Sequence, residues 1–162
     1  MRMLELTLPR LAVAVLALGV GVAGCGGDSD DPTEPGGNNN SNLPVVVNGG
    51  VYTEWSAKLT TTGNAVYPTL AVGFDQTTAV LSGTNRDNNE EVDLSTTGTV
   101  DSNGNIVLTS VLTNGGSPRA TIKFTGKISG SGSSQTITGT YEATGPSVSN
   151  PPETGSFTMD HT

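Results

Sequence analysis

The side chains that could do chemistry are few, and the first of them is Cys25, the only cysteine in the chain. A thiolate is a nucleophile, so a cysteine can carry a covalently attached group. The only histidine is His161, one residue from the last position of the sequence. Segments near chain ends fray, which makes a residue there a poor metal ligand or catalytic base. We therefore interpret His161 as an exposed side chain without a catalytic role.

Two acidic clusters could attract a divalent cation. One lies within residues 28–34, and the other is Asp87–Glu91 together with Asp93. The first cluster lies in a polar run, where acidic side chains are usually just solvated. The second reads as a charged loop between two strands, and adjacency in sequence does not place two carboxylates across a substrate as glycoside hydrolysis requires. Neither cluster predicts a metal site or a catalytic pair.

The segment Asp101–Asn105 has the acidic start of a calcium-binding loop but lacks its spacing. Glycine stands at the fourth position, and Leu112 stands where such a loop needs a bidentate acid. The run Asp-Ser-Asn-Gly-Asn favours a hairpin turn instead, because Asn and Gly tolerate positive φ. The chain also lacks a nucleophile elbow and a phosphate-binding glycine loop. The sequence thus predicts no catalytic residue, no cofactor and no metal, and an enzyme is not expected.

The residues before Cys25 have the pattern of a processing segment. Arg2 and Arg10 precede an apolar run, Leu11–Val22, which is about a dozen residues long. Crossing a bilayer takes about 20 apolar residues, so the run is too short for a permanent anchor and fits the core of a signal peptide. We therefore predict a signal peptide over residues 1–24.

The apolar run ends in Val22, Ala23, Gly24 and Cys25. An aliphatic residue, two small residues and a cysteine resemble the lipobox of bacterial lipoproteins. The resemblance implies a diacylglyceryl group on the Cys25 thiol and cleavage before Cys25 by signal peptidase II. It also implies that a fatty acid such as palmitate acylates the new amino group of Cys25. Two or three acyl chains would hold the protein firmly on a membrane. The alternative is an ordinary secretory signal that leaves Cys25 as a free thiol.

The residue after the cysteine bears on location. Gly26 stands where an aspartate would indicate retention in the inner membrane of a Gram-negative host. The lipoprotein resemblance therefore implies a cell-envelope protein, with the outer membrane or cell surface favoured. The net charge of −8 repels phosphate backbones, so nucleic acid is not an expected partner, and membrane contact is expected through the lipid rather than a basic patch.

Residues 25–44 contain the lipidated cysteine and a run rich in Gly, Asp, Asn and Pro. Such a run cannot bury enough apolar area to offset the entropy lost on ordering, so we predict a disordered polar linker. Residues 45–162 are predicted to form one domain. Because Cys25 is the only cysteine, this domain cannot use a disulfide, and its stability must come from burial and hydrogen bonds.

From Val45 onward, apolar and polar residues alternate with the period of a β-strand. In 119–129, for example, Ala120, Ile122, Phe124 and Ile128 share one face. The pattern predicts about eight strands, over residues 54–59, 66–74, 77–84, 92–101, 105–113, 119–129, 136–143 and 155–161. No stretch after the signal peptide has a helical period, so we predict no helix there.

Tight turns separate these strands, with Asn and Gly at 101–105 and at 114–117. An all-β antiparallel meander of this kind closes into an up-and-down β-barrel or folds as a β-sandwich. Gly83, Gly98, Gly126 and Gly139 fall on the predicted inward face, where a missing side chain permits the sharp bending that a barrel needs. The barrel is therefore favoured over the sandwich.

A short stretch near the first strand is similar to the opening motif of the lipocalin and avidin group of small β-barrels. It consists of Gly50, Val51, Tyr52 and Trp55. The likeness covers only these residues, and an avidin-like pocket needs several tryptophans where this chain has one. No binding residue is carried over from that group.

Two functional hypotheses follow. In the first, the domain is a non-catalytic structural or interaction module of the envelope, whose partner is a protein or a glycan. In the second, it is a lipocalin-like barrel that binds a small apolar ligand in its interior. A ligand carrier needs a roomy cavity with apolar and aromatic lining. Aromatic residues make up only 4% of this chain, so we expect them to fill the core and favour the first hypothesis.

Overall fold

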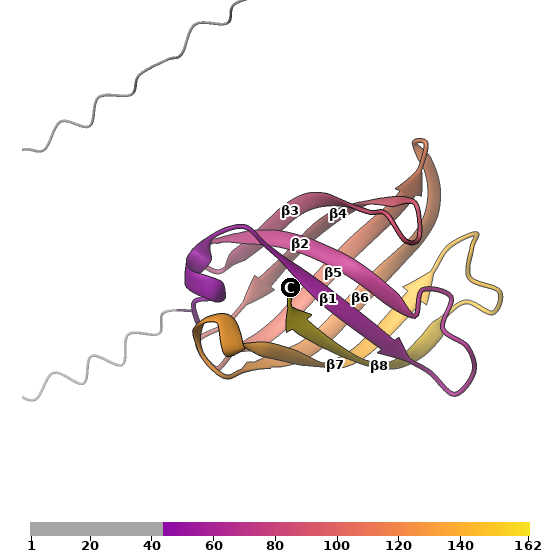
Figure 1. The fold of residues 1–162 in the computed structure, drawn as a ribbon. Coiled ribbons are helices and arrows are strands. Elements are labelled where there is room, and N and C mark those ends of the chain that lie inside the picture. The colour runs from indigo at the N-terminus through magenta and orange to yellow at the C-terminus, as the bar shows by residue number, and fades with distance from the viewer. Residues whose placement is uncertain (1–43) are drawn as a thin grey trace, which may run out of the picture. The chain divides into compact units, whose positions relative to one another are not determined.

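The computed structural model describes residues 44–162, which form a closed up-and-down β-barrel of eight antiparallel strands (Figure 1). Each strand pairs with the next, and β8 pairs back with β1. The strands are β1 Thr53–Thr60, β2 Thr69–Thr77, β3 Val80–Asp87, β4 Val92–Val100, β5 Asn105–Asn114, β6 Ser117–Ser129, β7 Thr136–Thr144 and β8 Glu153–His161. The all-β fold class and the barrel are confirmed, and the sandwich is not formed.

The alternation of apolar and polar residues along the strands produces the core. On β6, the side chains of Ala120, Ile122, Phe124 and Ile128 are buried inside the barrel, and most of their neighbours face solvent. The remaining strands repeat this pattern, so one cluster of apolar side chains fills the interior. Burial of this area is the main force that holds the barrel closed, since no disulfide contributes.

Glycines on the inward face let neighbouring strands approach closely. Gly126 on β6 lies directly opposite Gly139 on β7. A Cβ on Gly126 would collide with the backbone of Thr138, and one on Gly139 would collide with the backbone of Thr125. The strands can therefore curve tightly only because these side chains are missing, as predicted from the sequence.

The barrel has two ends. At the first, which we call the cap end, lie the start of the described chain, the last residues of β8, and the turns β2–β3, β4–β5 and β6–β7. At the other, the loop end, lie the turns β1–β2, β3–β4, β5–β6 and β7–β8. Tyr67 and Val148, from the two longest loops at that end, are buried and join the core cluster.

The cap is formed by residues 44–52, which contain the 3₁₀ turn η1, Asn48–Gly50. Its Val47 side chain is only 3% exposed and closes the mouth of the barrel. The β6–β7 connection contains a second 3₁₀ turn, η2, Gly132–Ser134, which lies beside η1 (Figure 1). Both turns depart from the prediction that the domain has no helix, but each is a single tight turn of three residues.

Two glutamines fasten the cap. On β2, Gln76 Oε1 accepts a hydrogen bond from Val47 N at 2.6 Å, and its Nε2 donates to the Val45 carbonyl at 2.9 Å. Beyond η2, Gln135 Oε1 accepts a hydrogen bond from Asn48 N at 2.7 Å. These side chains satisfy backbone groups that no strand ladder reaches.

The third strand departs from its predicted bounds. It runs over Val80–Asp87 instead of 77–84, because the β2–β3 turn contains Thr78 in a left-handed conformation (φ 56°) where no Asn or Gly signals a turn. Its inward positions near the end are polar, Asn85 and Asp87, which breaks the alternation.

The predicted signal peptide, the predicted lipobox and the predicted linker up to residue 43 lie outside the described residues. In residues 44–162, no helical segment reaches the length and apolar character needed to cross a bilayer.

Candidate functional site

The barrel interior, the first place to look for a ligand site, is occupied by the protein's own side chains. Trp55 stacks on Phe74 with ring centroids 5.9 Å apart, and Phe124 packs edge-on against Phe157 at 5.0 Å. The space left between η1, Trp55 and Phe74 does not admit a water-sized molecule. A drug-sized ligand needs several hundred Å³, so the closed barrel has no room for one beneath its cap.

The core contains a few polar groups. Thr96 and Ser110 face each other across β4 and β5, and their hydroxyls form a buried hydrogen bond of 2.9 Å. The indole N–H of Trp55 is fully buried without a hydrogen-bond partner, and so is Nε2 of His161. A buried polar atom left unpaired costs about 1–3 kcal/mol, so the region around Trp55 and His161 is a weak point of the core.

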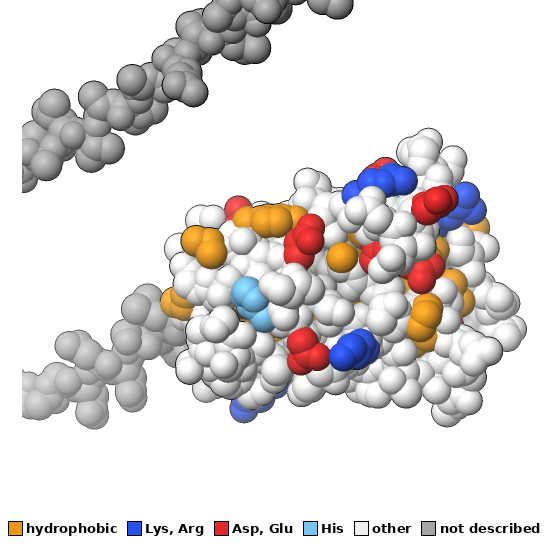
Figure 2. Space-filling view, viewed as in Figure 1, with side chains coloured by type: hydrophobic (Ala, Val, Ile, Leu, Met, Phe, Trp, Pro, Cys, Tyr) orange, Lys and Arg blue, Asp and Glu red, His pale blue; other side chains and the backbone are white. Residues whose placement is uncertain are grey.

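His161 is more ordered than the sequence suggested. It pairs with Trp55 across β1 and β8, and the two rings meet edge-on with centroids 5.3 Å apart. The side chain is partly exposed at the surface (Figure 2). The neighbouring Thr162 is also fixed, because its N–H and its hydroxyl both donate to the Glu54 carbonyl. The strand ladder therefore extends to His161 at the end of β8, and Thr162 is hydrogen-bonded to β1.

The acidic loop at 87–91 has a structural role in Asp87. Its side chain is 3% exposed; Oδ1 accepts hydrogen bonds from Asn89 N and Glu90 N and so closes the β3–β4 turn. Its other oxygen accepts from Ala71 N on β2 at 2.7 Å. These three hydrogen bonds give the Asp87 carboxylate a structural role, in which it holds the β3–β4 turn and joins it to β2.

The side chains of Asn85 and Asp87 also seal the seam between β2 and β3. Backbone pairing of these strands covers only the three pairs nearest their turn, from Asp75–Ser82 to Thr77–Val80. Beyond it, Asn85 Oδ1 accepts from Gly73 N at 3.0 Å and its Nδ2 donates to the Ala71 carbonyl at 2.7 Å. Side-chain amides thus replace a backbone ladder, and the exposed edge that would invite aggregation is closed.

The turn at 101–105 is the hairpin turn between β4 and β5, as the sequence predicted. Asp101 Oδ1 accepts hydrogen bonds from the backbone N–H groups of Asn103 and Asn105, both at 2.8 Å, and its Oδ2 accepts from Asn105 Nδ2 at 2.7 Å. The side-chain and backbone hydrogen bonds from Asn105 lower the pKa of Asp101 below its ordinary value of 3.8.

At the loop end, a tyrosine and a carboxylate are coupled. The Tyr141 hydroxyl, inside the barrel, donates to Glu153 Oε1 at 2.7 Å, and Glu153 also accepts from Val66 N. Burial, and then the hydrogen bond to Glu153 and its charge, raise the pKa of Tyr141 well above the ordinary 10.0. The pair ties the β1–β2 loop to β7 and β8 and leaves a neutral phenol at neutral pH, so it offers no nucleophile.

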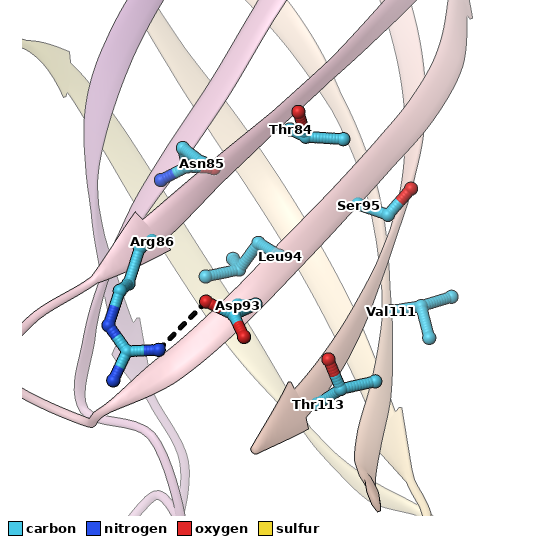
Figure 3. A pocket seen from close by; sticks show the side chains of 8 residues that line it. All are labelled: Thr84, Asn85, Arg86, Asp93, Leu94, Ser95, Val111 and Thr113. Atoms are coloured by element: carbon cyan, nitrogen blue, oxygen red, sulfur yellow. Dashed lines mark hydrogen bonds and ion pairs between the residues drawn. The ribbon is translucent and has the colours of Figure 1, made fainter. Parts of the chain in front are cut away.

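A shallow groove of about 380 Å³ crosses the outer face of β3, β4 and β5 (Figure 3). The Arg86 guanidinium, at one side, donates to Asp93 Oδ1 at 2.8 Å. The hydroxyl groups of Thr84, Ser95 and Thr113 add donors and acceptors along the groove, which is lined by Thr84, Asn85, Arg86, Asp93, Leu94, Ser95, Val111 and Thr113.

The structure brings together few of the residues singled out in the sequence. Asp87 is hydrogen-bonded within a turn, and Asp93 forms an ion pair with Arg86. Cys25 and the predicted lipobox, Val22, Ala23 and Gly24, lie outside the described residues. Within residues 44–162, no group of three or more His, Cys, Asp or Glu side chains is placed to hold a metal ion. Sequence reasoning missed Gln76 and Gln135, because lone glutamines in a Ser/Thr-rich chain carry no pattern.

No protein-family profile, no curated protein and no solved structure significantly matches this chain.

Proposed function

We propose that this chain is a lipid-anchored protein of a bacterial cell envelope, in which Cys25 carries the lipid and the barrel is a non-catalytic interaction module. After cleavage between Gly24 and Cys25, the linker would join the lipid to the barrel. The outer membrane or the cell surface is the favoured location, since Gly26 lacks the inner-membrane retention signal.

The observation that carries the anchor is the position of the only cysteine. It stands directly after Val22, Ala23 and Gly24, at the end of an apolar run of signal-peptide length. A single acyl chain binds membranes reversibly, but the two or three chains that a lipoprotein carries hold it stably. A polar linker after the cysteine gives the barrel room to act beside the membrane.

The filled core supports an interaction module over a ligand carrier, and the outer wall offers polar contacts. Thr125 on β6 lies opposite Thr140 on β7, and both are exposed. Thr138 on the same face of β7 is exposed as well. Each hydroxyl can donate and accept a hydrogen bond, which suits the hydroxyl groups of a glycan or the backbone of a protein.

One observation favours the second candidate function, a barrel that binds a small molecule. The unpaired indole N–H of Trp55 lies directly beneath the cap and would hydrogen-bond an acceptor if the cap opened. The absence of space for even a water molecule there places this candidate second.

The anchor is tested with Cys25→Ala in the original host. We expect the wild-type chain to fractionate with membranes and to take up a radiolabelled fatty acid, and the variant to do neither. Ser41→Ala, a change within the linker that leaves the lipobox intact, is the matched control and should behave as the wild type. A Cys25→Ala protein that still fractionates with membranes would show that the lipid is not the anchor.

A further inference from the structure

Exposed large apolar side chains gather at the cap end of the barrel. Figure 2 shows apolar side chains over the end that bears η1. Four of the six such side chains in residues 44–162 belong to the cap or the adjoining β2–β3 turn: Val46 at 58% exposure, Val51 at 63%, Tyr52 at 47% and Val80 at 52%. The other two, Val107 and Val111, lie on the wall at β5. No loop of the opposite end exposes a side chain of this kind.

These apolar groups are held in place and are not part of a frayed end. The Val46 carbonyl accepts a hydrogen bond from Gln135 Nε2 at 3.0 Å, and the next residue, Val47, is buried in the mouth of the barrel. The Tyr52 hydroxyl donates to the Thr84 carbonyl at 3.1 Å, across Gly73, where a side chain would collide with the ring. The structure therefore fixes an apolar surface at this end, which we call the apolar collar: Val46, Val51, Tyr52 and Val80.

Charged side chains are scarce in the connections at the cap end of the barrel. The cap segment 44–52, the β2–β3 connection 77–80 and the β6–β7 connection 130–135 contain no Asp, Glu, Lys or Arg. In the β4–β5 turn, the one charged side chain is Asp101, and its carboxylate accepts hydrogen bonds from Asn103 and Asn105 within that turn. At the loop end, Glu90 and Glu91 face solvent at least in part. The connections at the cap end thus contain a single carboxylate, Asp101, although Asp75 and Asp160 lie on the strands close to that end.

We infer that the apolar collar is a membrane-contacting surface and that its occupant is the bilayer to which Cys25 is anchored. This inference rests on the proposed lipid anchor. The chain between Cys25 and the barrel joins it at Pro44, in the cap itself, so the anchor delivers this end to the bilayer first. The predicted linker has a root-mean-square reach of roughly 25 Å, which keeps the collar within reach of the lipid headgroups.

Weak binding of the collar to the bilayer is sufficient, because the lipid anchor already holds the barrel at the membrane. Tethering makes the encounter intramolecular, at an effective concentration on the order of millimolar, so a collar with little affinity of its own is still occupied much of the time. The tether and the collar contact together orient the barrel upright, with the groove on β3–β5 and the side chains of Glu90 and Glu91 available to a partner.

The test uses the full lipidated chain, purified from host membranes and reconstituted into vesicles of phosphatidylethanolamine and phosphatidylglycerol that contain a nitroxide-labelled lipid. One sample carries Val51→Cys with an environment-sensitive fluorophore on the new thiol, and its matched control carries Ser149→Cys, at the loop end, with the same label. We expect the label at position 51 to be quenched at least about twofold more than the label at position 149. Adding Val46→Ser and Val80→Ser should reduce that difference without releasing protein from the vesicles.

The other outcomes are distinct from one another. Protein that co-floats with vesicles but gives equal quenching at positions 51 and 149 overturns the collar contact and leaves the anchor intact. Labels at position 51 that transfer energy to each other at high dilution in lipid, without quenching by the nitroxide, make a second copy the occupant and overturn the inference. Protein that does not co-float refutes the lipid anchor itself.

Discussion

Gln135→Ala is the sharpest perturbation of the cap, because this side chain is 5% exposed and makes two hydrogen bonds to it. Its Oε1 accepts from Asn48 N at 2.7 Å, and its Nε2 donates to the Val46 carbonyl at 3.0 Å. Each such bond contributes about 1 kcal/mol net, so truncation should lower the free energy of unfolding by about 2 kcal/mol. Because 1.4 kcal/mol is a factor of ten, a cap loosened by that amount should exchange the Asn48 amide hydrogen about 30-fold faster.

The assay is urea denaturation combined with amide hydrogen exchange, on a chain that begins at Gly26 and so carries no lipid. Ser134→Ala, an exposed neighbour in η2, is the matched control and should change the free energy of unfolding by less than about 0.5 kcal/mol. If Gln135→Ala behaves like this control in both measurements, the glutamine does not hold the cap, and the argument for a fixed apolar collar loses its basis.

Three further changes test other parts of the barrel. Phe124→Ala should lower the free energy of unfolding, measured in urea, by about 3–5 kcal/mol, because it leaves a cavity in a packed core. The control is Thr125→Ala, a change at an exposed neighbour, which should lower it by less than about 1 kcal/mol. Equal effects of the two substitutions would mean that the interior is loosely packed. Asn85→Ala should lower the free energy of unfolding by about 2 kcal/mol and speed amide hydrogen exchange along β2, because it removes two hydrogen bonds that replace backbone pairing. Unchanged exchange would show that β2 and β3 hold together without the Asn85 side chain. Burial, and then the hydrogen bond to Glu153, raise the pKa of Tyr141 in the folded chain, so the stability that its protonated form contributes is present below pH 10 and is lost as the pH rises above that value. Tyr141→Phe should therefore lose less stability than the wild type between pH 10 and pH 11, and a parallel decline of the two proteins would refute the raised pKa.

Most of the barrel could be predicted from the sequence because alternation is a local signal. In β6, Ile122 and Phe124 face inward simply because they are two residues apart. The inward glycines could be predicted in the same way, since Gly126 continues the parity of Phe124. Closure by the β1–β8 pair follows only indirectly, because alternation says which way a side chain faces and not which strand is its neighbour.

The parts that could not be predicted depend on single side chains that bond to distant backbone. Gln76 and Gln135 hold a cap that has no periodicity of its own, and their partners are up to 89 residues away in sequence. Asn85 and Asp87 are polar residues at inward positions, so the alternation of apolar and polar residues predicted an end of the third strand at residue 84 instead of Asp87. The turn before that strand was missed because Thr78, with a positive φ, is not a residue that signals one.

We propose a lipid anchor on Cys25 joined to a barrel whose interior is filled by its own side chains. The most direct test is the mass of the mature protein extracted from host membranes, measured first under native conditions and then denatured. We expect a chain that begins at Cys25 and carries two or three acyl chains, with the same mass in both measurements. A chain with an unmodified Cys25 thiol would contradict the anchor, and a native adduct of roughly a few hundred daltons that is lost on denaturation would contradict the filled barrel.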